Sequence, residues 1–126
     1  MKRDNKIYWI ATSIVALIAL MAGIMYFISP MVAERFKHLG FPDYFRIELA
    51  IAQLIGAFAL ILPMVSNRIK EWAYAGFTIV FISATTAHLV VDGMAEAISP
   101  LIQLLLLVIS YVYFTKVKNY KAITGN

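Results

Sequence analysis

Cysteine is absent from this chain, and charged residues are scarce. The 126 residues include no cysteine, which excludes disulfide bonds, thiolate metal sites, iron–sulfur clusters and c-type haem attachment. Charged residues make up 14% of the chain and apolar residues 62%, whereas soluble domains have about 25% charged residues. A soluble domain of this length has too little interior to bury so much apolar surface. The composition therefore excludes a water-soluble globule, a disordered chain and a nucleic-acid-binding module.

Sequence motifs of common enzyme classes are also missing. The chain has no P-loop, no Gly-x-Ser-x-Gly, no His-Glu-x-x-His and no dinucleotide-binding fingerprint. Its two histidines are His38 and His88, and only His88 falls in an apolar segment, so one chain cannot hold a bis-histidine haem between two spans. The sequence predicts no metal site and no bound cofactor.

Four long apolar segments are present. A bilayer core of about 30 Å needs about 20 helical residues at 1.5 Å each. We predict membrane-spanning helices over residues 7–28, 44–65, 72–91 and 100–116. Helices are favoured because the segments lack the alternation of barrel strands. The predicted fold is an all-α integral membrane protein, a four-helix transmembrane bundle that forms a single domain over residues 1–126.

The connection between the first two spans carries helix signals. Ser29-Pro30 is typical of an N-cap followed by proline at the first helical position, and Gly40 and Pro42 end the segment. We predict a short amphipathic helix on the outer membrane surface, with an ordered loop as the alternative. A second Ser-Pro pair, Ser99-Pro100, predicts the start of the fourth helix.

Lysine and arginine indicate the orientation. Eight of them lie in the N-terminal segment, the connection between spans two and three, and the C-terminal tail, whereas only Arg35, Lys37 and Arg46 lie on the other side. Cytoplasmic segments are enriched in these residues. Both termini are therefore predicted to be cytoplasmic, which agrees with an even number of spans.

Polar residues from several spans are predicted to lie at one depth. Glu48, His88 and Gln103 each fall about 5 to 6 Å below the outer boundary at 1.5 Å per residue. Asp92 follows His88 by four positions and therefore shares its helix face, and Tyr26 ends the first span on the same side. These five residues predict an outward-facing polar pocket, with a purely structural polar network as the alternative.

Helical spacing predicts which faces point inward. Small residues mark helix contacts in lipid, so Glu48 is expected to face the bundle together with the small residues that follow it at helical spacing. The inward stripes are predicted as Glu48, Ala52, Gly56, Ala59 and Pro63; Thr12, Ala16, Ala19 and Gly23; Phe77, Phe81, Thr85 and His88; and Pro100, Gln103, Leu107, Ser110 and Phe114.

The stretch from Phe36 to Tyr113 resembles the DoxX-like family of small bacterial membrane proteins. The matching features are the Lys37–Pro42 loop, Glu48 and Pro63 at the two ends of the second span, the segment Lys70–Phe77, His88, and Ser110-Tyr111. The resemblance implies a four-span helical bundle in a bacterial inner membrane, with Glu48 and His88 at polar positions typical of the family. The family's founding member is similar to a membrane subunit of a thiosulfate–quinone oxidoreductase, and the wider group is similar to animal chaperones of acetylcholine receptor assembly.

Three functions stay open at this point. The first is a non-catalytic accessory, assembly or ligand-binding protein whose partners are the lipid bilayer and another membrane protein, a quinone or a small hydrophobic ligand. The second is the membrane subunit of a quinone-linked oxidoreductase, in which Glu48 and His88 exchange protons with the quinone. The third, a small proton-coupled transporter, is disfavoured because such transporters need a deep acidic residue in span one, where this chain has none.

Overall fold

A computed structural model describes residues 2–124, which form five helices. They are α1 (Lys2–Ile28), α2 (Pro30–His38), α3 (Asp43–Ile61), α4 (Asn67–Val91) and α5 (Met94–Thr124). No strand occurs among the described residues. Four helices, α1, α3, α4 and α5, are long and apolar enough to cross a membrane, so the predicted all-helical fold with four candidate spans is confirmed.

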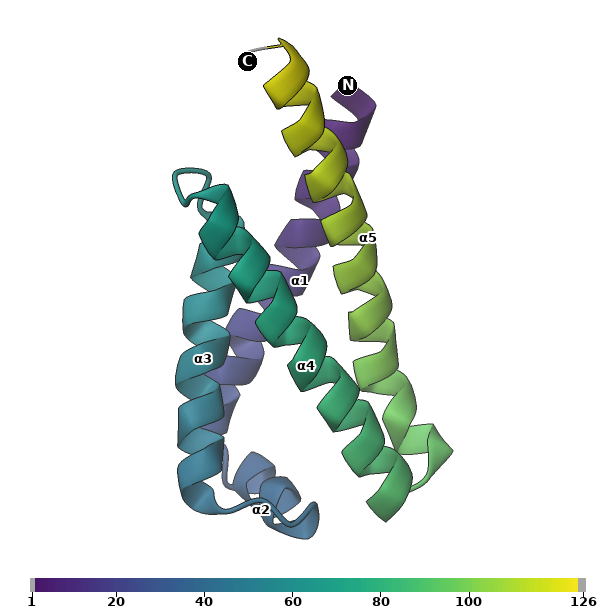
Figure 1. Cartoon of the computed structure of the whole chain (residues 1–126). Coiled ribbons are helices and arrows are strands. Elements are labelled where there is room, and N and C mark those ends of the chain that lie inside the picture. The colour runs from purple at the N-terminus through teal and green to yellow at the C-terminus, as the bar shows by residue number, and fades with distance from the viewer. Residues whose placement is uncertain (1, 125–126) are drawn as a thin grey trace.

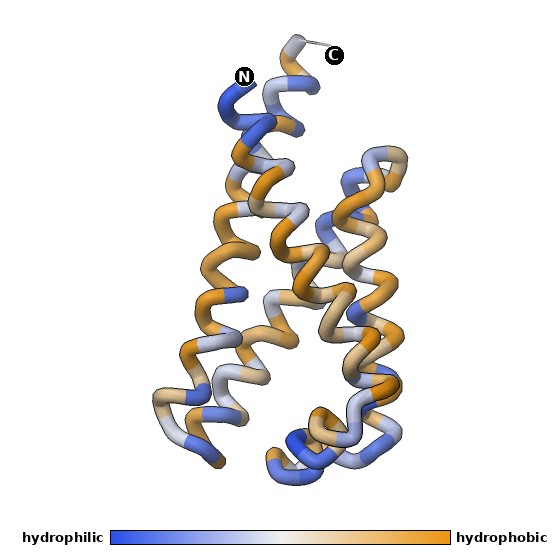
Figure 2. The backbone as a smooth tube through the Cα atoms, turned by 180° about the vertical axis from the view of Figure 1, so that it is seen from behind, coloured by the Kyte–Doolittle hydropathy of each residue, from blue (hydrophilic) through white to orange (hydrophobic). Residues whose placement is uncertain are grey.

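The four long helices form a closed ring. Helix α1 packs against α3 and α5, and α4 packs against the same two neighbours. The first and last described residues lie at one end of the bundle, called here the termini end, whereas α2 and the α4–α5 turn lie at the other, the loop end (Figure 1). Hydrophobic residues dominate the middle of the long helices, and hydrophilic residues gather toward both ends (Figure 2).

Several helix boundaries differ from those expected: α1 and α4 begin five residues earlier, α5 extends to Thr124, and two further differences involve proline. Helix α3 ends at Ile61 instead of residue 65, because Leu62 is extended (φ −80°, ψ 121°) ahead of Pro63, and proline disfavours a helical conformation in the residue before it. Helix α5 begins at Met94, so Pro100 lies inside it and does not start it. Burial of Pro100 and of Ala97, one turn earlier, on the packed face outweighs the local signal at Ser99.

The start of α2 agrees with the sequence signals. Ser29 is the N-cap, its side chain accepts a hydrogen bond from the Val32 amide at 3.3 Å, and Pro30 occupies the first turn. Phe36 is the buried residue of this helix, and its ring meets Tyr26 edge-on at 5.0 Å between centroids. An apolar anchor therefore holds α2 against α1.

Small residues let α1 and α3 approach closely. The predicted α1 stripe of Thr12, Ala16, Ala19 and Gly23 is entirely buried. A Cβ at Gly23 would lie 2.9 Å from Leu54 Cδ2 and 3.2 Å from the Ala50 carbonyl oxygen. The absence of a Cβ at Gly23 therefore allows α3 to pack this closely on α1.

Hydroxyl groups connect three helices near the termini end. Ser110 Oγ lies 2.6 Å from Thr12 Oγ1 and 2.6 Å from the Tyr74 hydroxyl. Thr12 and Ser110 have no exposed surface, and Tyr74 is only 3% exposed. Each buried hydroxyl thus has a partner from another helix, which satisfies polar groups that would otherwise be costly in this interior.

Cations from following helices cap two helix C-termini. Arg46 of α3 donates a hydrogen bond to the carbonyl of Tyr26, near the end of α1. Lys70 of α4 donates to the carbonyls of Ala59, Leu60 and Leu62 at the end of α3, each at 2.9 Å. These carbonyls have no partner within their own helix and carry the negative end of its dipole, so the two cations stabilise both ends.

Candidate functional site

A cavity of about 200 Å³ lies near the loop end of the bundle. Its walls include apolar side chains such as Ile18, Ala22, Val80 and Phe81. Polar side chains from all five helices also line it: Tyr26 of α1, Arg35 of α2, Gln53 of α3, His88 of α4, and Glu96, Ser99 and Gln103 of α5. The cavity thus combines an apolar wall with hydrogen-bonding groups of both charges.

Gln53 is the most buried polar residue of this cavity. It is 3% exposed, and its carbonyl oxygen Oε1 has no hydrogen-bond partner among the described residues. A buried acceptor without a partner costs about 1–3 kcal/mol. The cavity therefore contains an acceptor that a molecule with an O–H or N–H group would satisfy.

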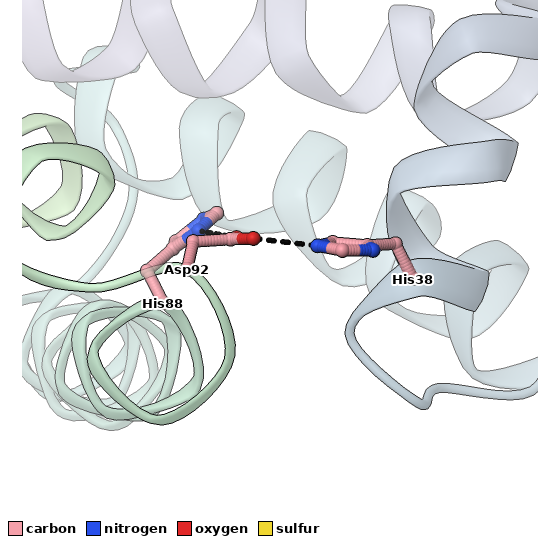
Figure 3. A network of polar contacts seen from close by, with 3 residues as sticks. All are labelled: His38, His88 and Asp92. Carbon is pink, nitrogen blue, oxygen red and sulfur yellow. Dashed lines mark hydrogen bonds and ion pairs between the residues drawn. The ribbon is translucent and has the colours of Figure 1, made fainter.

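Asp92 links two histidines beside the cavity. Its Oδ1 lies 2.5 Å from His38 Nε2, and its Oδ2 lies 3.1 Å from His88 Nδ1. Figure 3 shows the carboxylate between the two imidazole rings, with His38 reaching it from α2 and His88 from α4. The hydrogen bond from His38, and to a smaller extent the one from His88, lowers the pKa of Asp92 below its ordinary value. The Asp92 carboxylate therefore joins α2 to the α4–α5 turn.

The structure brings three of the five predicted site residues to the same cavity. Tyr26, His88 and Gln103 line it. Asp92 does not line it but contacts His88, as the spacing of four positions predicted. These four residues come from α1, α4, α5 and the α4–α5 turn, and the structure brings them together at the loop end.

Glu48 lies elsewhere, which corrects its predicted inward orientation. It is exposed and is not among the residues that line the cavity. The buried residues of α3 are Ala50, Gln53, Ala57, Ala59 and Leu60, and of the predicted stripe only Ala59 is among them. The stripe expected to carry Glu48 inward instead lines an apolar groove of about 400 Å³ between α3 and α4, through Ala52, Gly56 and Ala59.

Several residues of the site were not expected from the sequence. Gln53 lies on the buried stripe at positions 50, 53, 57 and 60, which is a helical spacing, so the sequence carried a signal for it. Arg35 and His38 come from the short α2, and Glu96 precedes the expected start of the last helix. The positions of Arg35 and His38 depend on how α2 packs against the other helices, and no local sequence pattern predicts that packing.

No metal-binding arrangement is found in the described part of the chain. No group of three or more His, Cys, Asp or Glu side chains there could hold a metal ion. His38 Nε2 and His88 Nδ1 are hydrogen-bonded to the Asp92 carboxylate. The geometry is suited to holding a small polar molecule by hydrogen bonds. Among the lining residues, His88 and Glu96 are of types that exchange protons in enzymes.

Comparison with family models gives a match. The family model described as the DoxX-like family matches residues 10–110. That range extends from the first half of α1 to the middle of α5 and contains every residue that lines the cavity. No match was found among curated proteins or among solved structures.

Proposed function

Because the chain belongs to the DoxX-like family and is a multi-pass membrane protein with four candidate spans, we propose that it binds a small molecule in the loop-end cavity as a non-catalytic ligand-binding protein. The observation that supports this most directly is the unpartnered Gln53 carbonyl at a cavity lined from all five helices. A bundle built only for stability would gain by replacing such a group with an apolar one of the same shape.

The cavity limits the chemistry of the ligand. Its volume of about 200 Å³ is below the 300–1,000 Å³ typical of sites for drug-sized molecules. An O–H or N–H group would pair with Gln53, an apolar part would lie against Val80 and Phe81, and Arg35 or Glu96 would meet a polar substituent. The ligand class is therefore a small amphiphile or the head group of a larger one.

The Asp92 link bears on how such a ligand enters. Helix α2 packs on α1 and α3, and His38 connects it across to Asp92. Since Arg35 of α2 lines the cavity, movement of α2 would open it. We place this end of the bundle on the outer face of a bacterial inner membrane, with both termini cytoplasmic, because eight of the eleven lysines and arginines lie toward the termini end.

The test compares small molecules retained by purified variants. Wild-type protein, Gln53→Leu and Glu48→Gln are extracted from membranes in mild detergent, and organic extracts are examined by mass spectrometry. Glu48→Gln is the matched control because Glu48 is exposed and outside the cavity. We expect one compound near equimolar amounts in wild type and control, and at least fivefold less in Gln53→Leu. Equal amounts in all three, or no retained compound in wild type, would contradict the proposal.

A hydroquinone head group is a second candidate for the occupant. It carries O–H donors for the Gln53 acceptor, and His88 lines the same cavity as a group able to take a proton. The protein would then be the membrane subunit of a quinone-linked oxidoreductase, and a partner subunit would supply the electron carrier. Titration with decylubiquinol distinguishes this case: it requires saturable binding by wild type that His88→Ala weakens at least tenfold.

A further inference from the structure

A second cavity lies at the termini end, opposite the loop-end cavity. Its volume is about 130 Å³, and it is formed where α1, the α3–α4 connection, α4 and α5 meet. Three lysines line it, Lys70, Lys118 and Lys121, together with the amides of Asn5 and Asn67. No carboxylate is among its lining residues. The cavity is therefore rich in hydrogen-bond donors and positive charge.

Lys70 places an ammonium group in the wall of this cavity. The residue is only 4% exposed, and its Nζ donates three hydrogen bonds to backbone carbonyls. Three donated bonds match the three N–H groups of an ammonium. Within residues 2–124 it forms no ion pair. The carbonyl dipoles at the end of α3 compensate part of this charge, and an anion in the adjacent cavity would compensate the rest.

The two lysines of α5 add accessible positive charge. Lys118 Nζ lies 3.2 Å from Glu71 Oε1 and 5.5 Å from the centre of the Phe114 ring. Lys121 is exposed and forms no ion pair among the described residues. The Glu71 carboxylate therefore offsets only one of the three lysines that line the cavity.

Size and position identify the anion class. A volume of about 130 Å³ accommodates a phosphate group but not a drug-sized molecule. Trp9, a residue type that prefers the membrane–water interface, also lines the cavity, and Phe114 and Val117 form its apolar floor. Basic pockets between membrane helices bind anionic lipid head groups.

We propose that this termini-end cavity binds a phosphate group, either that of an anionic phospholipid or free phosphate. The Asn5 and Asn67 amides and the Lys118 and Lys121 ammonium groups donate hydrogen bonds to the phosphate oxygens. The Lys70 ammonium, whose donors are already used, acts through its charge. This site is independent of the loop-end cavity, since the two have no lining residue in common.

The experiment uses Trp9 as the reporter. The other tryptophan, Trp72, lines the α3–α4 groove, so Trp72→Phe leaves Trp9 as the single tryptophan. The protein in neutral detergent is titrated with short-chain phosphatidylglycerol, with phosphatidylcholine of the same chains, and with inorganic phosphate. We expect a saturable change in Trp9 fluorescence with phosphatidylglycerol at concentrations at least tenfold below those needed with phosphatidylcholine. Binding of inorganic phosphate in the same range would assign the site to free phosphate.

Matched variants separate the cavity from general surface charge. Lys118→Gln/Lys121→Gln removes two charges that line the cavity, whereas Arg68→Gln/Lys116→Gln removes two that do not. We expect the first pair to weaken phosphatidylglycerol binding at least tenfold and the second less than threefold. Asn5→Leu, which changes no charge, should weaken it at least threefold. Equal effects of the two pairs, or equal affinity for both lipids without binding of inorganic phosphate, would overturn the proposal.

Discussion

Single polar residues join parts of this chain that apolar packing does not hold together. Helix α2 packs on α1 and α3, and its connection to the α4–α5 turn is the hydrogen bond between His38 and Asp92. The Asp92 side chain is 21% exposed and that of His38 59%, so the link is accessible to water. Its strength should therefore respond to pH and to substitution.

We predict that Asp92→Asn loosens α2. Spin labels on Glu34→Cys and Met94→Cys, introduced into a chain without cysteine, would report the distance between α2 and the α4–α5 turn by electron paramagnetic resonance. The distance distribution should be broader in Asp92→Asn than in the parent, because a neutral amide makes weaker hydrogen bonds than a carboxylate. Glu48→Gln is the control, and an equal broadening there would contradict a specific role of Asp92.

We also predict that the distance distribution between α2 and the α4–α5 turn depends on pH. Hydrogen bonds from His38 and His88 lower the pKa of Asp92, so the folded state prefers the carboxylate more than the unfolded chain does. The stabilisation is then complete above the ordinary aspartate pKa of about 3.9 and is lost as the pH falls through the lowered pKa. The distance distribution should stay narrow from pH 5 to pH 7 and broaden below about pH 4. Broadening already between pH 7 and pH 5 would contradict this assignment.

At the scale of helices, each of two C-termini is stabilised by the next long helix along the chain. Arg46 of α3 caps α1, and Lys70 of α4 caps α3. Neither α1 nor α3 has a basic residue in its own last turn, so the favourable interaction with the helix dipole comes from outside the helix.

Two glycine substitutions, Gly23→Ala and Gly76→Ala, test how closely the helices pack. Gly23→Ala introduces a Cβ 3.2 Å from the Ala50 carbonyl oxygen, and overpacking of this kind costs about 1–3 kcal/mol. At Gly76 nothing lies within 4 Å of the added Cβ, so Gly76→Ala should raise the free energy of unfolding by up to about 1 kcal/mol through helix propensity. Thermal unfolding in detergent should show a lower midpoint for Gly23→Ala and an unchanged or higher one for Gly76→Ala.

At the scale of the whole molecule, the ring of four long helices places two cavities at opposite ends. The loop-end cavity includes residues of all five helices, whereas the termini-end cavity is lined mainly by α1, α4 and α5. The first and last described residues and the α3–α4 connection share one end (Figure 1). Most of the lysines and arginines therefore lie at the termini end of the bundle, and few lie at the loop end.

Labelling of single cysteines tests the orientation that we propose. Glu34→Cys lies in α2 at the loop end, and Lys121→Cys lies near the end of α5 at the termini end. A membrane-impermeant maleimide added to intact spheroplasts should label Glu34→Cys at once and Lys121→Cys only after permeabilisation. The reverse pattern would place the loop-end cavity on the cytoplasmic side.

Much of the fold follows from local sequence patterns. Long apolar runs require helices because backbone groups in lipid must pair within their own segment, and all four appear as helices. Buried faces on α1 and α5 follow from helical spacing, with Thr12, Ser110 and Phe114 all buried. The end of α3 was not predicted correctly, since one proline outweighs an apolar run that continues through it.

The candidate site was predictable only where periodicity alone places a side chain. The sequence by itself determined a membrane protein of four apolar helices and the pairing of His88 with Asp92, because these depend on composition and on 3.6 residues per turn. Tertiary structure decided that Gln53, and not Glu48, reaches the interior, because the rotation of α3 depends on which small residues fit against α1. It also decided that His38 meets Asp92, since a contact between residues 54 positions apart depends on how the helices pack and not on any local pattern.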